Sequence, residues 1–295
     1  MNLRPDRVLI QGITEPLGSY YAVRMKAYGT NVVGGVSPGQ GGQLLDGIPI
    51  FDLVEQALPV VGRVDTTIIF VQPYWAIDAA LEAIAAGIRQ IILVTAGIPP
   101  LDMVCLLRKA EDTGTVILGP SSSGIIVPEK ILLGIQESEF YTPGVVGLIS
   151  RSGTLTYEVA WELTQAGLGE SICVSLGRDA IVGSGFPQWL KALDEDESTK
   201  AIVLVGQAGG GREEATAEYI AAAIDKPVVA YFAGSHAPLD RRMGDANNII
   251  SYHMSMPIPE SGTAQRQITA FKQAKIPVAK RPSQIPELVK KALKK

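Results

Sequence analysis

Short apolar runs rich in β-branched residues alternate along the chain with longer segments in which apolar residues return every three or four positions. Such short runs are typical of parallel strands buried on both faces, and the longer segments are typical of amphipathic helices. The runs fall into a first series at residues 8–10, 31–36, 67–71, 90–95 and 116–118, and a second at 145–149, 172–175, 201–205 and 227–232. This alternation predicts a doubly wound α/β fold in each series.

The two series are separated by a turn-rich break, residues 119–124, and by an irregular stretch to Pro143 that we interpret as a hairpin or loop. We therefore expect two domains, residues 1–122 and 123–295. Helical spacing is clearest at residues 77–87, 157–166 and 213–224. These segments end near Gly or before Lys-Pro, which are helix-stop signals.

Composition limits the classes of function. The 295 residues are 46% hydrophobic, enough for two packed cores, and 26 basic against 30 acidic residues leave a formal charge of −4. Basic residues gather only near the end of the chain, which argues against a nucleic-acid partner. The first residues lead straight into a strand-like run, without a secretory or membrane-spanning segment, so we expect a cytoplasmic protein with no membrane partner.

The two cysteines and three tryptophans are expected to have packing roles. Cys105 and Cys173 lie in apolar surroundings without the spacing of a metal or disulfide site, so we expect core positions for both and no metal site. Trp75, Trp161 and Trp189 are expected to fill cores or an interface.

Two glycine-containing turns carry candidate chemistry. In the first, the strand at 8–10 runs into Gln11-Gly-Ile-Thr-Glu-Pro-Leu-Gly18 and then an apolar helix, as in a loop that binds a dinucleotide or CoA. A nicotinamide site would call for an acidic residue after the second strand, and Ser37 there argues against NAD.

The second turn is Ser150-Arg-Ser-Gly-Thr-Leu-Thr-Tyr-Glu158, where a buried strand turns into a helix. Backbone N–H groups at a helix start attract a phosphoryl group, and Ser152, Gly153 and Thr154 would supply hydroxyls and a close backbone approach. An ordinary helix capped by serine is the alternative reading.

These turns, together with Arg241-Arg-Met-Gly-Asp-Ala-Asn-Asn-Ile-Ile250, resemble the α subunit of succinyl-CoA synthetase and related nucleotide-forming acyl-CoA ligases over nearly the whole chain. The resemblance implies a Rossmann-like CoA-binding domain followed by a flavodoxin-like ligase domain. It also implies the activity: a carboxylic acid, CoA and a nucleoside triphosphate give acyl-CoA, nucleoside diphosphate and phosphate, as in the tricarboxylic acid cycle. Tyr157 would face the acyl substrate.

By the same resemblance, CoA would contact eight positions in the first domain. They are Gly12, Thr14, Gly18, Ser37, Gln40, Thr95, Gly97 and Ser121.

The CoA motifs of the family are altered at four places. Glu15 replaces the central loop glycine, Gln40 a lysine, Ala96 an acidic residue, and Ser121-Ser-Ser123 the sequence Asn-Cys-Pro. A carboxylate at a helix start repels phosphates, and the lost lysine removes a phosphate partner, so CoA affinity is expected to fall by about one to three orders of magnitude. Alternatively, Glu15 points to solvent and the serines supply replacement donors.

The phosphoryl-carrier histidine of the family, in Arg-Met-Gly-His-Ala, is replaced by Asp245, and the glutamate that supports it is replaced by Gln207. The double exchange preserves the local charge and gives the carboxylate an amide donor, so we expect these side chains within hydrogen-bond reach. Asp245 could itself form an acyl phosphate. The lone His236 and His253 are expected to have surface or core roles.

Arg178 stands in Gly177-Arg-Asp-Ala180, where the family has Gly-Gly-Asp-Pro. Such a cation could close the phosphoryl pocket or hold an anion, and the sequence leaves both readings open.

No Walker loop or ATP-grasp-like stretch is present in the sequence. The resemblance therefore implies a β-type ATP-grasp partner that carries the nucleotide and Mg²⁺, a small carboxylic acid as substrate, and a hetero-oligomer. The alternative is a non-catalytic homologue that acts as a regulatory or structural subunit, or as a sensor of a small anion.

Overall fold

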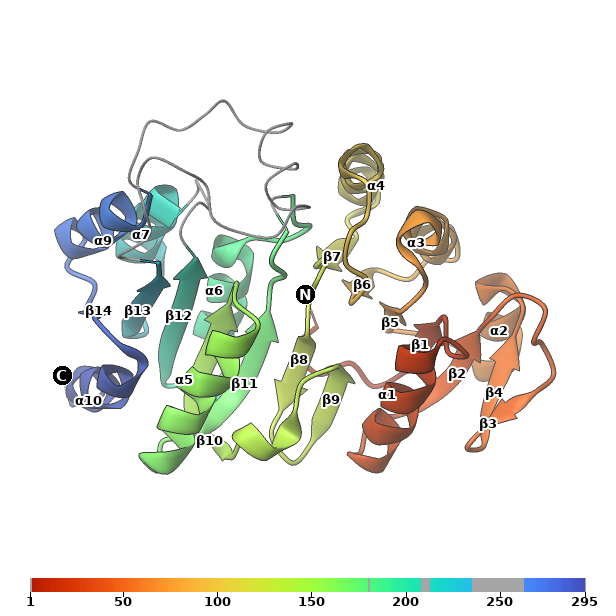
Figure 1. Cartoon of the computed structure of the whole chain (residues 1–295), viewed down its shortest axis with the longest axis horizontal. Helices are drawn as coiled ribbons and strands as arrows, with labels where there is room; N and C mark the ends of the chain where they lie inside the picture. Colours follow the sequence, from red (N-terminus) through yellow and green to blue (C-terminus); the bar gives the residue numbers. More distant parts are fainter. Residues whose placement is uncertain (1, 180, 208–212, 235–262, 295) are drawn as a thin grey trace. The chain divides into compact units, whose positions relative to one another are not determined.

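The computed structural model describes residues 2–179, 181–207, 213–234 and 263–294. The chain divides into two compact units: residues 1–136 with 181–184, and residues 137–180 with 185–295. Each unit has parallel strands and helices of its own (Figure 1). The predicted domain boundary after residue 122 stays a prediction.

The first unit is built on a sheet with the strand order β3-β4-β2-β1-β5-β6-β7. All neighbours are parallel except β3 and β4. Without the short β3, the order becomes 3-2-1-4-5-6 in chain sequence, which is the Rossmann arrangement. The strands are β1 (Val8–Gln11), β2 (Val32–Val36), β3 (Leu44–Leu45), β4 (Ile48–Phe51), β5 (Thr66–Ile69), β6 (Gln90–Leu93) and β7 (Val116–Leu118).

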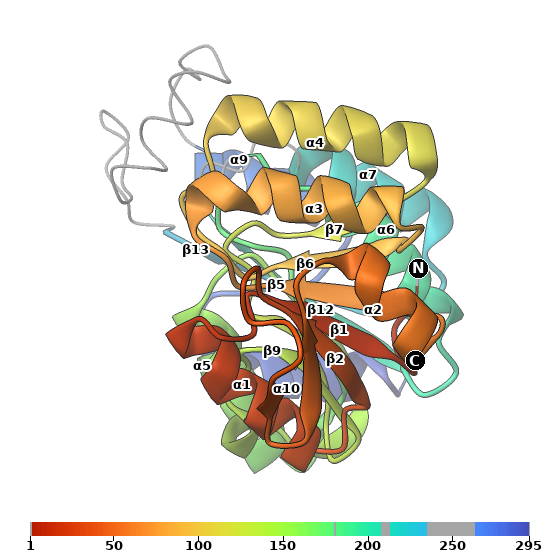
Figure 2. The ribbon, with the colours of Figure 1, turned by 90° about the vertical axis from the view of Figure 1, so that its right-hand side faces the viewer.

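Helices cover both faces of this sheet. Apolar residues of α2 (Val54–Val61), α3 (Ala76–Ala85) and α4 (Pro100–Thr113) share one buried cluster with strand residues such as Leu9 and Ile69. Figure 2 shows these helices on one face and α1 (Pro16–Ala27) on the other. A 3-10 turn, η1 (Pro73–Trp75), precedes α3.

The stretch expected to be a hairpin or loop is a hairpin. Strands β8 (Gly124–Val127) and β9 (Ile131–Gly134) pair antiparallel. The hairpin is fixed beside the end of α1, because the Thr30 hydroxyl donates a 2.6 Å hydrogen bond to the carbonyl oxygen of Leu132 and accepts one of 3.0 Å from its N–H.

The parallel strands of the second unit follow the order β14-β13-β12-β10-β11. In chain sequence this is 5-4-3-1-2, the flavodoxin arrangement read from its far edge, so both expected fold types are confirmed. These strands are β10 (Pro143–Ser150), β11 (Glu170–Ser175), β12 (Ala201–Gln207), β13 (Val228–Ala233) and β14 (Val278–Ala279).

The helices of the second unit pack as two groups. Helix α5 contacts α10, whereas α7 contacts both α6 and α9. Their bounds are α5 (Thr154–Gln165), α6 (Phe186–Glu195), α7 (Glu213–Ala223), α9 (Thr263–Gln273) and α10 (Ile285–Ala292), with 3-10 turns η2 (Ser138–Phe140) and η3 (Pro282–Gln284).

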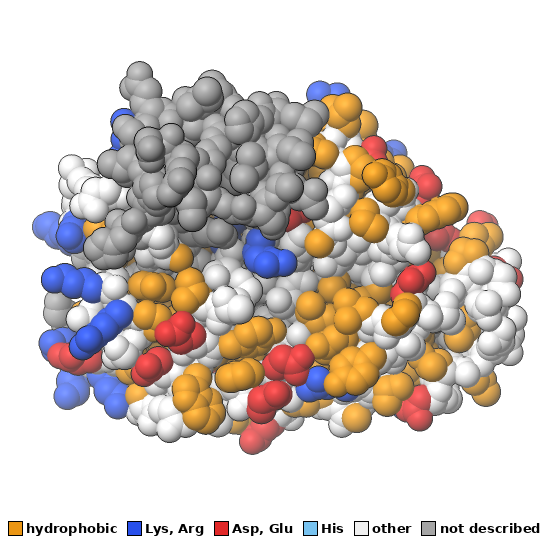
Figure 3. Space-filling model, in the orientation of Figure 1, with side chains coloured by type: hydrophobic (Ala, Val, Ile, Leu, Met, Phe, Trp, Pro, Cys, Tyr) orange, Lys and Arg blue, Asp and Glu red, His pale blue; other side chains and the backbone are white. Residues whose placement is uncertain are grey.

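The exposure of the cysteine and tryptophan side chains confirms some of their predicted core positions and contradicts others. Cys173 and Trp189 are fully buried, as expected, but the Cys105 prediction was wrong, because Cys105 lies exposed on α4. Trp75 and Trp161 are 65% and 47% exposed, so neither fills a core. Apolar side chains lie among charged ones on the face shown in Figure 3.

A buried carboxyl lies at the start of β11. Glu170 is 1% exposed; its Oε2 accepts a 3.3 Å hydrogen bond from the N–H of Thr142, while Oε1 has no hydrogen-bond partner among the described residues. Burial raises the pKa of Glu170 from 4.5 to about 8, and burial also raises the pKa of the nearby Tyr141. The folded chain therefore binds a proton that the unfolded chain releases.

We predict that the free energy of unfolding falls as the pH rises from about 4.5 to 8, because the unfolded carboxyl ionises in this window and the folded one does not. The loss is at most about 5 kcal/mol. Urea unfolding at several pH values measures it. Glu170→Gln removes the titrating group and should flatten this dependence, with the exposed Glu195→Gln as control. Equal pH slopes for Glu170→Gln and the wild type would contradict the assignment.

Candidate functional site

Each sheet has one place where the strand order reverses, and in open α/β sheets ligands bind at the carboxyl ends of the strands at such a place. In the first unit this place lies between β1 and β5. In the second unit it lies between β10 and β12. The two predicted sites follow the strands that flank these places.

All eight residues predicted to contact CoA follow carboxyl ends of strands in the first sheet. Gly12, Thr14 and Gly18 follow β1, Ser37 and Gln40 follow β2, Thr95 and Gly97 follow β6, and Ser121 follows β7. Because neighbouring parallel strands end at the same edge, the fold gathers these positions.

Hydrogen bonds link these loops to one another. The hydroxyl oxygens of Thr14 and Ser37 lie 2.5 Å apart, which joins the loop after β1 to the end of β2. The Thr95 hydroxyl donates to the carbonyl oxygen of Val71 at 2.7 Å, and the N–H of Ser121 donates to the carbonyl oxygen of Thr95 at 3.0 Å. Their contribution to a ligand site stays a prediction.

The glycines of the first loop are required by its backbone. Gly12 has a φ of +76°, and a β-carbon there would lie 2.8 Å from the backbone nitrogen of Val71. A β-carbon on Gly18 would collide with the carbonyl oxygen of Gly12. The loop can fold back on the start of α1 only because both side chains are absent.

Acidic groups occur in two of the loops at this edge of the sheet, one after β1 and one after β4. Glu15 occupies the N-cap position of α1, but its side chain makes no capping hydrogen bond. Asp52, which the sequence analysis missed, accepts hydrogen bonds of 2.7 and 2.9 Å from the N–H groups of Gly39 and Gly41. The Gln40 amide oxygen accepts from the Gln43 side chain at 2.6 Å. Both carboxylates disfavour an approaching phosphate.

The second site begins where β10 ends and α5 starts. The Ser150 hydroxyl oxygen accepts a 3.0 Å hydrogen bond from the N–H of Ser152 and a 2.7 Å bond from the Thr156 hydroxyl. Ser150 and Thr156, which the sequence analysis did not single out, therefore hold the turn from inside. Gly153 is at the N-cap position and has no side chain with which to cap the helix, although its carbonyl oxygen accepts a 3.2 Å hydrogen bond from the N–H of Thr156. The N–H groups of Thr154 and Leu155 are those that a bound anion would engage.

Arg178 lies beside this helix start. A β-carbon on Gly153 would lie 3.8 Å from Cδ of Arg178 and 3.9 Å from its Nη1. The loop that carries Arg178 is fixed by the Arg151 guanidinium, which donates to the carbonyl oxygens of Asp179 at 2.6 Å and Gly177 at 3.5 Å. A cation therefore adds to the positive end of the α5 dipole.

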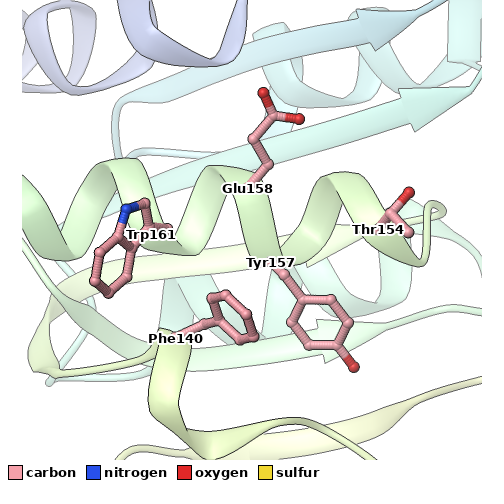
Figure 4. A pocket seen from close by; sticks show the side chains of 5 residues that line it. All are labelled: Phe140, Thr154, Tyr157, Glu158 and Trp161. Carbon is pink, nitrogen blue, oxygen red and sulfur yellow. The ribbon is translucent and has the colours of Figure 1, made fainter.

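A groove lies along α5 from this start. It has a volume of about 400 Å³ and is lined by Phe140, Thr154, Tyr157, Glu158 and Trp161 (Figure 4). We call it the α5 groove. It places Tyr157 beside the predicted phosphoryl-binding residue Thr154.

The predicted carrier group cannot be placed. Gln207 is the last residue of β12, but its side chain lies outside the described residues, as do Asp245, His236 and His253. The expected hydrogen bond between Gln207 and Asp245 stays a prediction. Within the described ranges, no group of three or more His, Cys, Asp or Glu side chains could hold a metal ion, and no helix is long and apolar enough to cross a membrane.

Two family models match the chain. Residues 4–97 match the CoA binding domain, and residues 149–273 match the CoA-ligase domain.

Relatives at about 40% identity extend over nearly the whole chain. The chain is 42% identical to succinate–CoA ligase [ADP-forming] subunit alpha 2 of Archaeoglobus fulgidus over 287 residues, covering 97% of each chain. It is 40% identical to subunit alpha of Aquifex aeolicus over 293 residues, covering 99% of this chain and 93% of that one.

Solved structures share the fold. ATP citrate lyase from Methanothrix soehngenii, in complex with citrate and coenzyme A, matches 99% of this chain with a TM-score of 0.82 and 19% identity. The dinucleotide forming acetyl-coenzyme A synthetase 1 of Ca. Korarchaeum cryptofilum, in complex with phosphate and ADP, matches 99% with a TM-score of 0.73 and 20% identity. The match covers 50% and 60% of those two chains.

If the start of α5 holds a phosphoryl group as predicted, Arg178→Ala should weaken binding of inorganic phosphate about two- to tenfold, because Arg178 is exposed and its charge is screened. Calorimetric titration at low ionic strength measures this. Arg178→Lys should keep most of the affinity, and Lys191→Ala, which removes an exposed cation on α6, should change nothing. Tighter binding by Arg178→Ala would mean that the arginine closes the site instead.

Proposed function

Because the chain belongs to the family of succinate–CoA ligase α subunits, we propose that it is the α subunit of an acyl-CoA ligase whose carrier step uses a carboxylate. Such a ligase converts a carboxylic acid, CoA and a nucleoside triphosphate into acyl-CoA, a nucleoside diphosphate and phosphate. The observation that carries this proposal is the start of α5, where open N–H groups and Arg178 meet at the reversal point of the second sheet.

The first unit would bind CoA at the carboxyl edge of its sheet. The match of residues 4–97 to a CoA binding domain and the loop glycines support this assignment. Glu15 and Asp52 place two carboxylates near the position of the phosphates, and Gln40 offers no positive charge. CoA would therefore bind, but more weakly than in a site with a lysine at position 40.

A β-type subunit would complete the enzyme. The relatives are named as α subunits, and neither a Walker loop nor an ATP-grasp-like stretch occurs in the sequence, so the nucleotide and Mg²⁺ are assigned to an ATP-grasp partner in a hetero-oligomer. The acid substrate would direct its carboxylate at the start of α5, where Ser152, Gly153 and Thr154 would surround the phosphoryl group.

Asp245 would take the place of the carrier histidine. In that step a carboxylate oxygen of Asp245 attacks the phosphorus atom, the bond from phosphorus to the oxygen of the donor breaks, and the donor leaves with that oxygen and its electron pair. The product is an acyl phosphate on Asp245. Gln207 would donate a hydrogen bond to this carboxyl group.

The exchange of histidine for Asp245 also favours a second candidate function. An α-type chain that cannot carry phosphate but keeps the anion site would act as a regulatory or structural subunit, or as a sensor of a small anion.

We predict that the chain, reconstituted with its β-type partner, forms a thioester from a carboxylic acid, CoA and nucleotide, and that nucleotide labels the α chain with phosphate that hydroxylamine releases. Asp245→Asn should abolish the label and lower turnover at least 100-fold, because the nucleophile is lost. Asp225→Asn, which changes an aspartate outside the site, is the matched control.

The repair variant Asp245→His with Gln207→Glu separates the two functions. A wild type that is inert, without a label, while the double variant turns over would establish the non-catalytic function. Each single substitution should stay inert in that case, because the imidazole needs the carboxylate partner. If no form of the pair makes a thioester, the ligase proposal is wrong.

We predict that Gln40→Lys tightens CoA binding about tenfold, since one added charge near a phosphate is worth on the order of 1 kcal/mol or more. Calorimetric titration of CoA measures the effect. Gln43→Lys adds the same charge three residues away and should gain much less. Low-micromolar affinity of the wild type for CoA would contradict the weakened site.

A further inference from the structure

The α5 groove has an apolar wall made by three aromatic rings. Phe140, from η2, packs against Tyr157 with ring centroids 5.2 Å apart and against Trp161 at 6.3 Å. Figure 4 shows the Phe140 ring between the other two. Trp161 nevertheless stays 47% exposed, so this wall is only partly covered by the chain itself.

The groove continues the predicted phosphoryl site. Thr154, Tyr157, Glu158 and Trp161 lie three and four residues apart, which places them on one face of α5. At a rise of about 1.5 Å per residue, the face from Thr154 to Trp161 extends roughly 10 Å. An acid whose carboxylate is held at Thr154 would therefore extend its tail over Tyr157 toward Trp161.

The charges that line the α5 groove determine whether it favours an apolar or a charged substrate tail. Among the described residues, its lining contains one charged side chain, the exposed carboxylate of Glu158, and no cation. In Figure 4 that carboxylate points away from the rings of Phe140 and Tyr157, so the rings remain available for apolar contact. A second carboxylate on the substrate would lose water without gaining a cationic partner and would be repelled by Glu158.

On the basis of the proposed function, we propose that the α5 groove binds the tail of the acid substrate, and that this substrate is a monocarboxylic acid with an aryl tail rather than a dicarboxylic acid. The volume of about 400 Å³ lies within the range of small-molecule sites, about 300–1,000 Å³. Aromatic rings pack edge to face or offset against one another, which suits an aryl tail lying against the wall formed by Tyr157, Phe140 and Trp161. Phe140 and Trp161 then determine specificity.

The test measures binding, so it does not depend on turnover. Phenylacetate and succinate are titrated into the full chain, alone and with its β-type partner, and followed by calorimetry. Tryptophan fluorescence is followed in a Trp75→Phe background, where Trp161 and the buried Trp189 remain, and the part of the change that Trp161→Ala removes is assigned to Trp161. Phenylacetate should bind and change the emission, whereas succinate should bind at least tenfold more weakly. Trp161→Ala and Phe140→Ala should each weaken phenylacetate binding about tenfold, equivalent to about 1.4 kcal/mol. Trp75→Ala, which removes a tryptophan that is also exposed but lies in the other unit, should not.

Other outcomes overturn the inference. Succinate binding as tight as phenylacetate binding, or no acid binding at millimolar concentration to either form, excludes an aryl-acid site. Variants that lose the β-type partner while keeping acid affinity make the groove a docking surface for that partner. An unchanged urea-unfolding transition of the second unit, which carries Phe140 and Trp161, shows that each variant is folded. If phenylacetate binds as expected while no thioester forms, the ligase proposal fails and the specificity of the groove stands.

Discussion

The structure depends on the burial of parallel strands on both faces. The faces of such a buried strand are occupied mainly by apolar side chains, so its ligand-binding groups lie in the loops at its ends. Because neighbouring parallel strands all end at the same edge, the loops that can bind a ligand lie together on one side of the sheet. In open α/β sheets, ligands bind where the strand order reverses. In the first sheet this place adjoins β1, which ends beside Gly12, and in the second it adjoins β10, which ends at Ser150. Both sites follow from strand order, before any particular side chain is considered.

The side chains then set the charge of each predicted site, and the two units differ. In the first, Glu15 places negative charge in the loop after β1, and Asp52 places it beside the loop after β2, where it accepts hydrogen bonds from the N–H groups of Gly39 and Gly41. In the second, Arg178 adds positive charge at a helix start that is already positive. These charges predict that an anion is favoured more strongly in the second unit than in the first.

Most of the fold could be predicted from sequence, because buried parallel strands read as unbroken apolar runs such as residues 90–95 and 201–205. Short or half-buried strands were not predicted. Ile48–Phe51 has alternating burial and contains Pro49, and Val278–Ala279 is too short to give a pattern. Cys105 was misplaced because an apolar neighbourhood in sequence need not face inward on a helix. Motif spacing located the loops, but it could not find Asp52 or the α5 groove, which arise from contacts between distant segments.

The two loop glycines have a bearing on how related chains should be compared. A β-carbon at position 12 would collide with the backbone of Val71, and one at position 18 with the backbone of Gly12. These collisions would occur whether or not a ligand is bound. A descendant that abandoned its cofactor would still be forced to keep both. Retention of these two glycines in related chains would therefore indicate a shared fold. Substitutions at neighbouring positions such as 15 and 40 would indicate whether ligand binding is still under selection.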